Sequence, residues 1–215
     1  RDSSTSRGLG DVYKRQLPTR GGDWYDGGLW QDVFLHKWGT KNDLVKGSWD
    51  YLYRVIAQAN KSLDKLNEIL AKDPENTSVP KYISEVRAFR ALYYYYLLDM
   101  FARVPLVTSS TTAMADVEQS ERSVVFTFVK TELEESVADL SDAHSNLPGE
   151  YYGRITKPVA YFLLAKLALN AEIYTDDNWT DGSKPDGKTI KFTVDGAEKN
   201  AWEATCLLYT SDAAD

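Results

Sequence analysis

The feature of this chain that most constrains its fold is a recurrence of apolar residues every three or four positions in four long segments. In the first segment the apolar positions run from Trp49 to Leu70 in alternating steps of three and four, as on one face of an α-helix. The turn-rich stretch Asp73–Pro80 ends that helix. The second segment carries a stripe of the same kind, formed by Tyr82, Val86, Phe89, Tyr93, Tyr96 and Met100. Both segments are expected to be helices that bury these stripes.

Three further helices are expected downstream. The third ends before Leu147–Gly149 and carries a stripe at Phe126, Val129, Leu133, Val137 and Leu140. The fourth begins with Thr156 as its N-cap and Pro158 in its first turn. It continues to Tyr174 with apolar residues on nearly every side, as a helix buried among other helices would. A fifth helix, which includes Trp202, is expected from about Ala197.

The spacing of these helices predicts the architecture. The expected helix starts, near positions 47, 81, 123 and 157, are roughly 34, 42 and 34 residues apart. A period of about 34 residues is that of the tetratricopeptide repeat, a helix–turn–helix unit. The predicted fold is therefore all-α, with stacked helical hairpins of the tetratricopeptide type. Long loops interrupt the stack, and Val104–Glu121 is the longest departure from the period.

The two ends of the chain are expected to be non-native. The tail CLLYTSDAAD and the stretch DVYKRQ near the front read back into DNA as complementary strands of one oligonucleotide. Such a pair resembles the transposase adaptor used to build shotgun sequencing libraries. We therefore interpret residues 1–16 and 206–215 as adaptor-derived segments. Residues 17–205 are then an incomplete helical repeat domain, an internal piece of a longer protein.

Composition excludes several classes of function. The only cysteine, Cys206, lies in an adaptor-derived segment, so residues 17–205 can form neither a disulfide framework nor a cysteine-based zinc or redox site. The net charge of −7 should repel nucleic acid, for which the neutralisation of phosphates dominates affinity. No run of 18 apolar residues occurs, so no membrane-spanning helix is expected.

Motifs for catalysis and cofactor binding do not occur in the sequence. There is no Walker loop, no GxGxxG and no GxSxG, so no cofactor is expected. His36 and His144 are far apart and are interpreted as ordinary surface or helix-end residues. Three glutamates, Glu132, Glu134 and Glu135, could suggest a glycosidase, which needs two facing carboxylates. Neighbouring positions on a helix cannot all converge, so they are interpreted as structural, with Glu134 and Glu135 as solvated charges.

The stretch Asp177–Gly182 (DNWTDG) has some resemblance to a calcium-binding loop. In that register Trp179 stands where an oxygen ligand is required, and Lys188 stands where a bidentate glutamate is required. Because two ligands fail, the stretch is predicted to be a solvated turn and no metal site is expected.

Four consecutive tyrosines, Tyr93–Tyr96, cover every side of the second helix. Tyr93 and Tyr96 fall on its apolar stripe and are expected to pack inside. Tyr94 and Tyr95 must meet another surface, either the next pair of helices or a partner protein. Packing in the core is the preferred interpretation.

The stretch RGGDWYDGGLW (Arg20–Trp30) holds the candidate binding residues Asp23, Trp24 and Asp26. The flanking glycine pairs permit positive φ and tight bends, which can fix a tryptophan at the surface. A flat indole beside carboxylates suits a sugar, because the ring covers the apolar C–H face while the acids accept hydrogen bonds from hydroxyls. The alternative is that Trp24 or Tyr25 only closes the end of the helix stack. A catalytic pair of Asp23 and Asp26 has no support.

Several motifs follow one another in a characteristic order, and the most specific is the segment Ser84–Thr108, with RAFRAL, an aromatic run and a VPL ending. The others are Arg20–Trp30, Trp49–Leu66, Arg122, Glu132–Leu140, Leu147–Gly149 and Tyr152–Tyr174. Together these ordered motifs resemble the SusD/RagB family of surface lipoproteins.

The resemblance implies a non-catalytic subunit that binds glycans at the bacterial outer membrane and delivers them to a SusC-type TonB-dependent transporter. Attachment would be through an N-terminal lipidated cysteine, which this sequence lacks. Family members are well over twice this length. Ala102 stands where the family often has glycine, a change expected to alter only the turn.

Two other functions stay open. The chain could be a helical-repeat scaffold that binds only protein, in which case Trp24 would have no role in glycan affinity. It could also be a fragment of an α-helical glycosidase, which would require Asp23 or Asp26 for hydrolysis.

Overall fold

The computed structural model describes the backbone of residues 26–213 and the side chains of residues 27–209. The chain divides into two compact units, Arg1–Tyr51 and Leu52–Asp215. The described part of the first unit contains the short helices η1 (Asp26–Gly28) and α2 (Leu29–Phe34). It also contains the start of α3, where the Asn42 side chain accepts hydrogen bonds from the amides of Leu44 and Val45 at 3.0 and 3.3 Å. Asn42 thereby caps α3.

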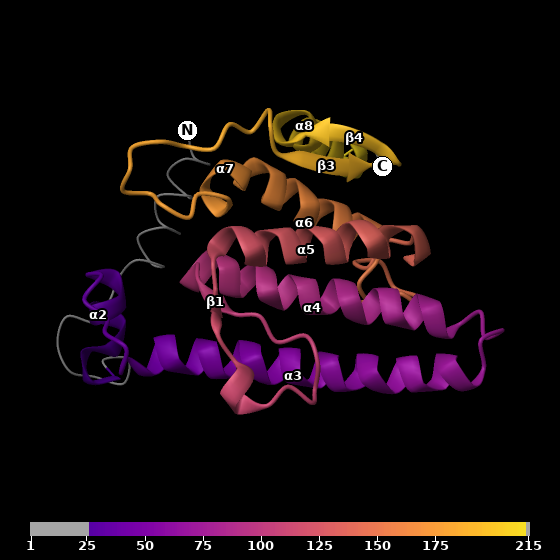
Figure 1. Cartoon of the computed structure of the whole chain (residues 1–215), viewed down its shortest axis with the longest axis horizontal. Coiled ribbons are helices and arrows are strands. Elements are labelled where there is room, and N and C mark those ends of the chain that lie inside the picture. Colours follow the sequence, from indigo (N-terminus) through magenta and orange to yellow (C-terminus); the bar gives the residue numbers. More distant parts are fainter. Residues whose placement is uncertain (1–25, 214–215) are drawn as a thin grey trace. The chain divides into compact units, whose positions relative to one another are not determined.

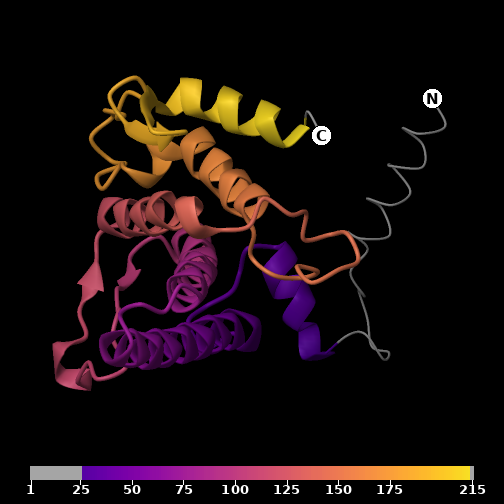
Figure 2. The ribbon, with the colours of Figure 1, turned by 90° about the vertical axis from the view of Figure 1, so that its right-hand side faces the viewer.

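The second unit is a stack of helices with two short hairpins. In Figures 1 and 2 the elements lie in successive layers from α3 through α4, α5 and α6 to α8, and the β3–β4 hairpin lies beside α8. Its elements are α3 (Asp43–Lys72, from Leu52 on), α4 (Val79–Phe101), β1 (Val104–Pro105), η2 (Met114–Asp116), β2 (Gln119–Ser120), α5 (Arg122–Ser136), η3 (Val137–Asp139), α6 (Lys157–Leu169), α7 (Ala171–Tyr174), β3 (Lys191–Val194), β4 (Ala197–Asn200) and α8 (Ala201–Ala213).

The expected all-α class is confirmed. Strands in the described residues form only two antiparallel two-stranded sheets, β1–β2 and β3–β4. Among the same residues, no helix combines the length and the apolar character that crossing a membrane requires. The α3 stripe is confirmed from Leu52 to Leu63, with Ile56 only 1% exposed. On α5, the stripe residues Phe126, Val129 and Leu133 are buried as expected.

The predicted apolar stripe of α4 was wrong. Its members Tyr82, Tyr96 and Met100 are exposed, so this row faces outward. The buried face of α4 instead consists of Val79, Ser84, Ala88, Arg90, Ala91, Tyr94, Tyr95, Leu97 and Leu98. The large aromatic residues gave the predicted stripe its periodicity, whereas the buried face mixes small residues with leucines and two of the four tyrosines.

The tyrosine run divides accordingly. Tyr96 is exposed, which contradicts its expected position in the core. Tyr94 and Tyr95 pack inside against the next helices, which confirms the preferred interpretation of packing in the core over contact with a partner protein. The Tyr94 ring meets Phe128 edge to face at 5.2 Å between centroids, and the Tyr95 ring meets Tyr174 at 6.4 Å. Burial raises the pKa of Tyr94 to about 12, and the hydroxyl is neutral at physiological pH.

The segment 104–110, which we call the strap, crosses α3 and α4 and is held by their side chains. The Tyr53 hydroxyl donates to the carbonyl of Pro105 at 2.7 Å, and the Asn60 amide donates to the carbonyl of Val107 at 2.8 Å. The Tyr94 hydroxyl donates to that same carbonyl at 2.9 Å and accepts from the Val107 amide at 2.8 Å. A polar loop backbone can lie against the core because these donors and acceptors replace water.

A buried ion pair lies beneath the strap. Arg90 donates through Nε and Nη2 to Glu132 Oε2 at 3.0 and 2.6 Å, and both residues are almost fully buried. Its Nη1 donates to Asn60 Oδ1 at 2.8 Å and to the carbonyl of Thr108 at 3.0 Å. Arg87 donates to the other oxygen of Glu132 at 2.9 Å. One carboxylate therefore joins α4 to α5, and Arg90 extends the connection to α3 and the strap.

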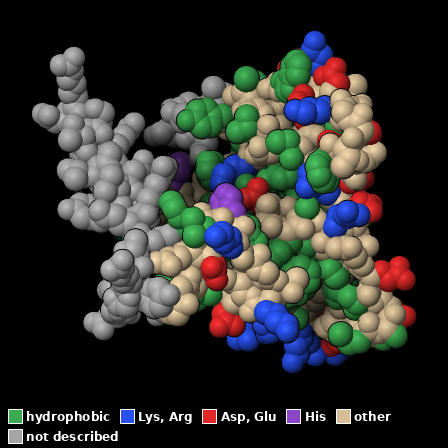
Figure 3. Space-filling view, turned by 90° about the vertical axis from the view of Figure 1, so that its left-hand side faces the viewer, with side chains coloured by type: hydrophobic (Ala, Val, Ile, Leu, Met, Phe, Trp, Pro, Cys, Tyr) green, Lys and Arg blue, Asp and Glu red, His purple; other side chains and the backbone are tan. Residues whose placement is uncertain are grey.

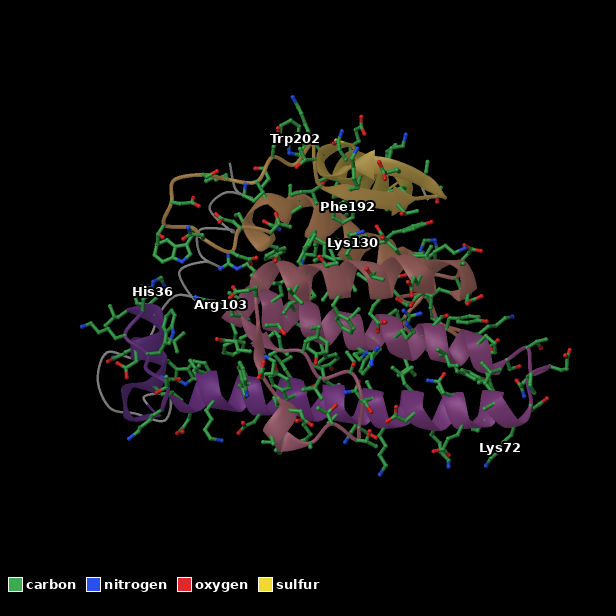
Figure 4. The ribbon with its side chains drawn as sticks, in the orientation of Figure 1. His36, Lys72, Arg103, Lys130, Phe192 and Trp202 are labelled. Atoms are coloured by element: carbon green, nitrogen blue, oxygen red, sulfur yellow. The ribbon has the colours of Figure 1, made fainter. Side chains whose placement is uncertain are left out.

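The expected solvated charge at Glu134 was wrong. Its side chain is only 12% exposed, and it pairs with Lys130 at 2.9 Å. Its Oε1 accepts the Thr193 amide at 2.7 Å. The β3–β4 hairpin covers this part of α5, and Lys130 lies over the Phe192 ring at 5.6 Å (Figure 4). Glu135, by contrast, is 56% exposed and pairs with Arg87, in agreement with a solvated position.

The later helices differ in their bounds. Thr156 stands at the N-cap position and Pro158 in the first turn of α6, as expected, although the Thr156 hydroxyl makes no capping bond. The helix expected to reach Tyr174 is divided at Asn170 into α6 and α7. The fifth helix begins at Ala201, four residues after the expected Ala197, because β3 and β4 form a hairpin there. The predicted boundary after residue 205 stays a prediction, since helical backbone in α8 is compatible with either origin of the tail.

Replacing Glu132 by alanine should destabilise the protein by about 3–5 kcal/mol, because Arg90 would remain buried without its counter-charge. Denaturant unfolding followed by circular dichroism measures this difference. The matched control is Glu135→Ala on the same helix, which removes an exposed pair with Arg87 and should cost about 1 kcal/mol or less. Equal losses of stability in the two variants would contradict the larger destabilisation expected when the buried ion pair is broken.

Candidate functional site

The three candidate residues predicted from the sequence lie at the edge of what the structure describes. Asp23 and Trp24 lie outside the described residues. Asp26 contributes backbone to η1, and its side chain lies outside them. Their part in a binding site therefore stays a prediction, and the site built below comes from the second unit alone.

A pocket of about 260 Å³ opens where α4 ends, α5 begins and the loop after α7 returns. Arg103 marks this end of the helix stack in Figure 4. The face drawn in Figure 3, on the side where that loop lies in Figure 1, carries acidic and basic side chains among hydrophobic ones. The pocket is lined by Phe101, Ala102, Arg103, Gln119, Glu121, Arg122, Asp176, Asp177 and Trp179.

The inner edge of the pocket is a sharp turn out of α4. Ala102 has a φ of 61° and a ψ of −81°, and its amide donates to the carbonyl of Leu98 at 3.0 Å. The chain then enters β1, which pairs with β2. Gln119 of β2 donates through its amide side chain to the carbonyl of Arg103 at 3.0 Å. The turn and the two-residue ladder together fix Arg103 at the rim.

The outer edge is attached to the start of α5 by Asp177. One oxygen of its carboxylate accepts the Ser123 amide at 2.9 Å, and the other accepts the Ser123 hydroxyl. The cap residue of α5, Glu121, makes no side-chain cap bond, so Asp177 satisfies an amide of the first turn from a distant loop. A negative charge at a helix N-terminus is also favoured by the helix dipole. Arg122 adds a bond to the carbonyl of Ile173 at 3.0 Å.

Trp179 lies at the tip of this loop and is 74% exposed. The expected turn around it is present and has its own hydrogen bonds. The Asn178 amide donates to Asp176 Oδ1 at 3.0 Å, and the Asn178 side chain donates to Asp181 Oδ2 at 3.1 Å. Thr180 donates its hydroxyl to Asn178 Oδ1 at 2.8 Å. These local bonds restrict the loop on either side of Trp179, whose side chain lines the pocket.

The pocket combines a flat apolar ring with charges of both signs. Arg103 and Glu121 approach to 3.6 Å and are each about half exposed, so water and ligand can reach both. Guanidinium groups donate hydrogen bonds, carboxylates accept them, and sugar hydroxyls can do either. The arrangement therefore suits a polyhydroxylated ring that stacks on Trp179 while its hydroxyls reach the charged rim.

A second exposed tryptophan, Trp202, is less available. Its indole N–H donates to Glu172 Oε1 at 3.1 Å, and Lys188 lies over its ring at 5.2 Å (Figure 4). One edge and one face of that ring are thus already engaged within the protein. Trp179 is the better platform for a ligand.

Sequence reasoning considered Trp179 only as a failed calcium ligand and missed it as a stacking residue. The signal was present, because an aromatic residue among Asp, Asn and Gly in a polar loop is the same pattern that drew attention to Trp24. The contributions of Arg103 and Glu121 had no local signal. They depend on the pairing of β1 with β2, two strands of two residues each.

Comparisons with known proteins agree with this architecture. A SusD-like family model, described as "Starch-binding associating with outer membrane", matches residues 12–169. The starch-binding protein SusD of Bacteroides thetaiotaomicron is 30% identical over 92 residues, which cover 43% of this chain and 16% of that protein. A laminarin-binding SusD-like protein of known structure is 27% identical, with a TM-score of 0.59 over 72% of this chain and 33% of its own.

A third relative shows likeness of fold. A SusD homolog from Bacteroides thetaiotaomicron superposes with a TM-score of 0.65 at 20% identity, covering 93% of this chain and 34% of the homolog. The chain thus spans about a third or less of the length of the relatives named here.

Replacing Ala102 by glycine should stabilise the protein by about 1 kcal/mol. A non-glycine residue at positive φ carries about 1–3 kcal/mol of backbone strain, which glycine would relieve. Glycine also has more entropy in the unfolded chain, and this offsets part of the gain. Denaturant unfolding measures the change. The control is Ala113→Gly, at an ordinary φ of −72°, which should instead destabilise slightly. A loss of stability in both variants would refute a strained turn at Ala102.

Proposed function

This chain belongs to the SusD-like family, and on that premise we propose that it is a non-catalytic glycan-binding subunit of a nutrient-uptake system. It captures oligo- or polysaccharide at the cell surface and delivers it to a SusC-type TonB-dependent transporter in the outer membrane. The transporter and the surface location are inferred from the family and not from residues of this chain. We assign the binding step to the Trp179 pocket of the second unit.

The observation that carries the proposal is the exposed indole of Trp179, held by its turn at the rim of a polar pocket. Stacking of a sugar ring on this face removes apolar surface from water without any displacement of protein groups. Arg103 and Glu121 then supply the hydrogen-bonding partners that orient the hydroxyls. Starch and laminarin, named for two of the similar proteins, are the first ligands to test.

The carboxylates of the pocket support binding rather than hydrolysis. Asp177 is committed to the first turn of α5, Asp176 to the Asn178 amide and Glu121 to Arg103. Glycoside hydrolysis requires two carboxyl groups that face each other across the scissile bond, one of them as a proton donor. Residues engaged in this way serve to shape the site and to accept hydrogen bonds from hydroxyls.

We propose that Asp23, Trp24 and Asp26 form a further saccharide-contacting edge in the complete protein. The support is their composition, an aromatic ring beside two carboxylates between glycine pairs. The alternative of a protein-binding scaffold draws support from the outward row of α4. There Phe89, Tyr93 and Tyr96 form successive ring contacts at 4.9 and 6.3 Å between centroids. Aromatic residues of this kind are enriched at protein interfaces, which also suits a transporter partner.

Trp179→Ala should weaken binding of starch or laminarin, whichever the intact chain binds, by about tenfold or more. The physical reason is the loss of a stacking surface worth about 1.5–3 kcal/mol, and each 1.4 kcal/mol is a factor of ten in affinity. Isothermal titration calorimetry or affinity electrophoresis measures this.

Two variants serve as controls for that experiment. Trp179→Phe keeps a ring and should retain most of the affinity, whereas Met114→Ala removes a different exposed apolar side chain, 87% exposed and outside the pocket. The thermal melt of each variant should match that of the wild type. Undiminished affinity in Trp179→Ala would refute this site. If Trp24→Ala and Trp179→Ala both left affinity unchanged, the scaffold function would be favoured.

A further inference from the structure

A second and larger groove, of about 530 Å³, lies at the other end of α4. It is bounded by the first turns of α4, by the end of α5 with η3, and by the loop that leads to α6. Its lining includes Tyr82, Glu85, Asp139, Tyr151 and Arg154. Neither the sequence motifs nor the Trp179 site accounts for this groove.

One lining residue of the groove, Arg154, is held in a fixed orientation. Arg154 donates through Nε and Nη2 to the two oxygens of Glu85 at 3.0 and 2.6 Å, a bidentate pair. The guanidinium carbon also lies over the Tyr151 ring at 5.0 Å. An arginine fixed on two sides presents its remaining N–H groups in a defined direction. Such preorganisation lowers the entropic cost of binding a ligand.

The carboxylates that line the groove already have partners. Glu85 is paired with Arg154, Asp142 with Lys157 at 2.5 Å, and Asp139 accepts the Ser84 hydroxyl at 3.1 Å. A cationic ligand would have to compete with these pairs. Hydroxyl groups would not compete with the pairs, because a hydroxyl can form a hydrogen bond with a carboxylate lone pair or a guanidinium N–H that the ion pair does not use.

Tyr82 supplies the apolar face that a saccharide needs. Its side chain is 49% exposed at the wall of the groove, on the outward row of α4. Together the half-exposed ring, the fixed guanidinium and the satisfied carboxylates reproduce the chemistry of the Trp179 pocket. They do so on a separate set of residues.

We infer that this groove is a second saccharide-binding site at the opposite end of α4 from Trp179. The inference rests on the proposed glycan-binding function. Tyr82 is the stacking residue of the second site, and Arg154 is its main hydrogen-bond donor.

The geometry of α4 gives the two sites a joint role. One groove contains Tyr82 near the start of the helix and the other contains Phe101 at its end. A helix of 23 residues is about 34 Å long, so the sites are separated by a rigid spacer. A trisaccharide reaches one of them at a time, whereas a polysaccharide can occupy both. Two linked contacts raise the affinity for the polymer above that of either site.

The experiment titrates the complete chain with maltotriose and laminaritriose, and with soluble starch and laminarin, by isothermal titration calorimetry. The wild type should bind two molecules of the preferred trisaccharide, and Tyr82→Ala and Trp179→Ala should each bind one. Tyr82→Ala should also weaken binding of the matching polymer at least tenfold. Tyr152→Ala, a 67% exposed tyrosine in the adjoining loop and outside the lining, should leave both values unchanged.

A direct readout comes from tyrosines labelled with ¹³C in the ring. In the Trp179→Ala protein, the resonance that disappears in Tyr82→Phe should shift on addition of the trisaccharide. Tyr82→Phe keeps a stacking ring and should restore the second binding event that Tyr82→Ala loses.

The possible failures are distinguishable. A single trisaccharide per wild-type chain, abolished by Trp179→Ala, would overturn the second site and leave the proposed function intact. The absence of binding by any of the four saccharides would overturn both. A Tyr82 resonance that shifts with trilysine and not with a trisaccharide would show that the groove selects cations, and would also overturn the inference.

Discussion

The contact between Arg90 and Glu132 is the interaction on which the rest of the second unit depends. Arg90 comes from α4 and Glu132 from α5, and the same guanidinium also reaches Asn60 of α3 and the carbonyl of Thr108 in the strap. Four segments distant in sequence thus meet at one buried cation. A buried ion pair is weak evidence for net stability, because desolvation offsets the attraction. Its consequence is geometric: only one register of the three helices and the strap satisfies every donor and acceptor.

That register determines where the binding pocket is. The strap begins with β1, which pairs with β2 through Val104 and Pro105. Because the strap is held to α3 and α4, the ladder and the Arg103 rim beside it have little freedom. On the far side of the pocket, Asp177 ties the Trp179 loop to the first turn of α5. The apolar platform and the polar rim are therefore placed by two independent attachments to the same helical core.

The sequence specified the helices well and their buried faces less well. Periodicity identified α3 and α5, because aliphatic residues dominate their stripes. It failed on α4, where tyrosines and phenylalanine repeat on the outward row and the buried face mixes alanines with leucines and Tyr94. The β3–β4 hairpin was missed although Asp195–Gly196 is a strong turn signal, and both residues have positive φ, 50° and 75°. The pairing of Arg90 with Glu132, 42 positions apart, had no local signal, because it depends on how α4 and α5 pack.

The error on α4 has a functional interpretation. A helix whose aromatic residues faced the core would present only polar side chains to a ligand. In this protein the core side of α4 combines Ala88, Ala91 and the Arg90 cluster with Tyr94 and Tyr95, and the exposed aromatic residues lie on the opposite row. The aromatic residues that gave α4 its misleading periodicity include Tyr82, which lines the groove at one end of the helix. Near the other end, the turn at Ala102 directs the chain to the pocket that Trp179 borders. Through Tyr82, the outward aromatic row of α4 thus contributes to the proposed binding surface.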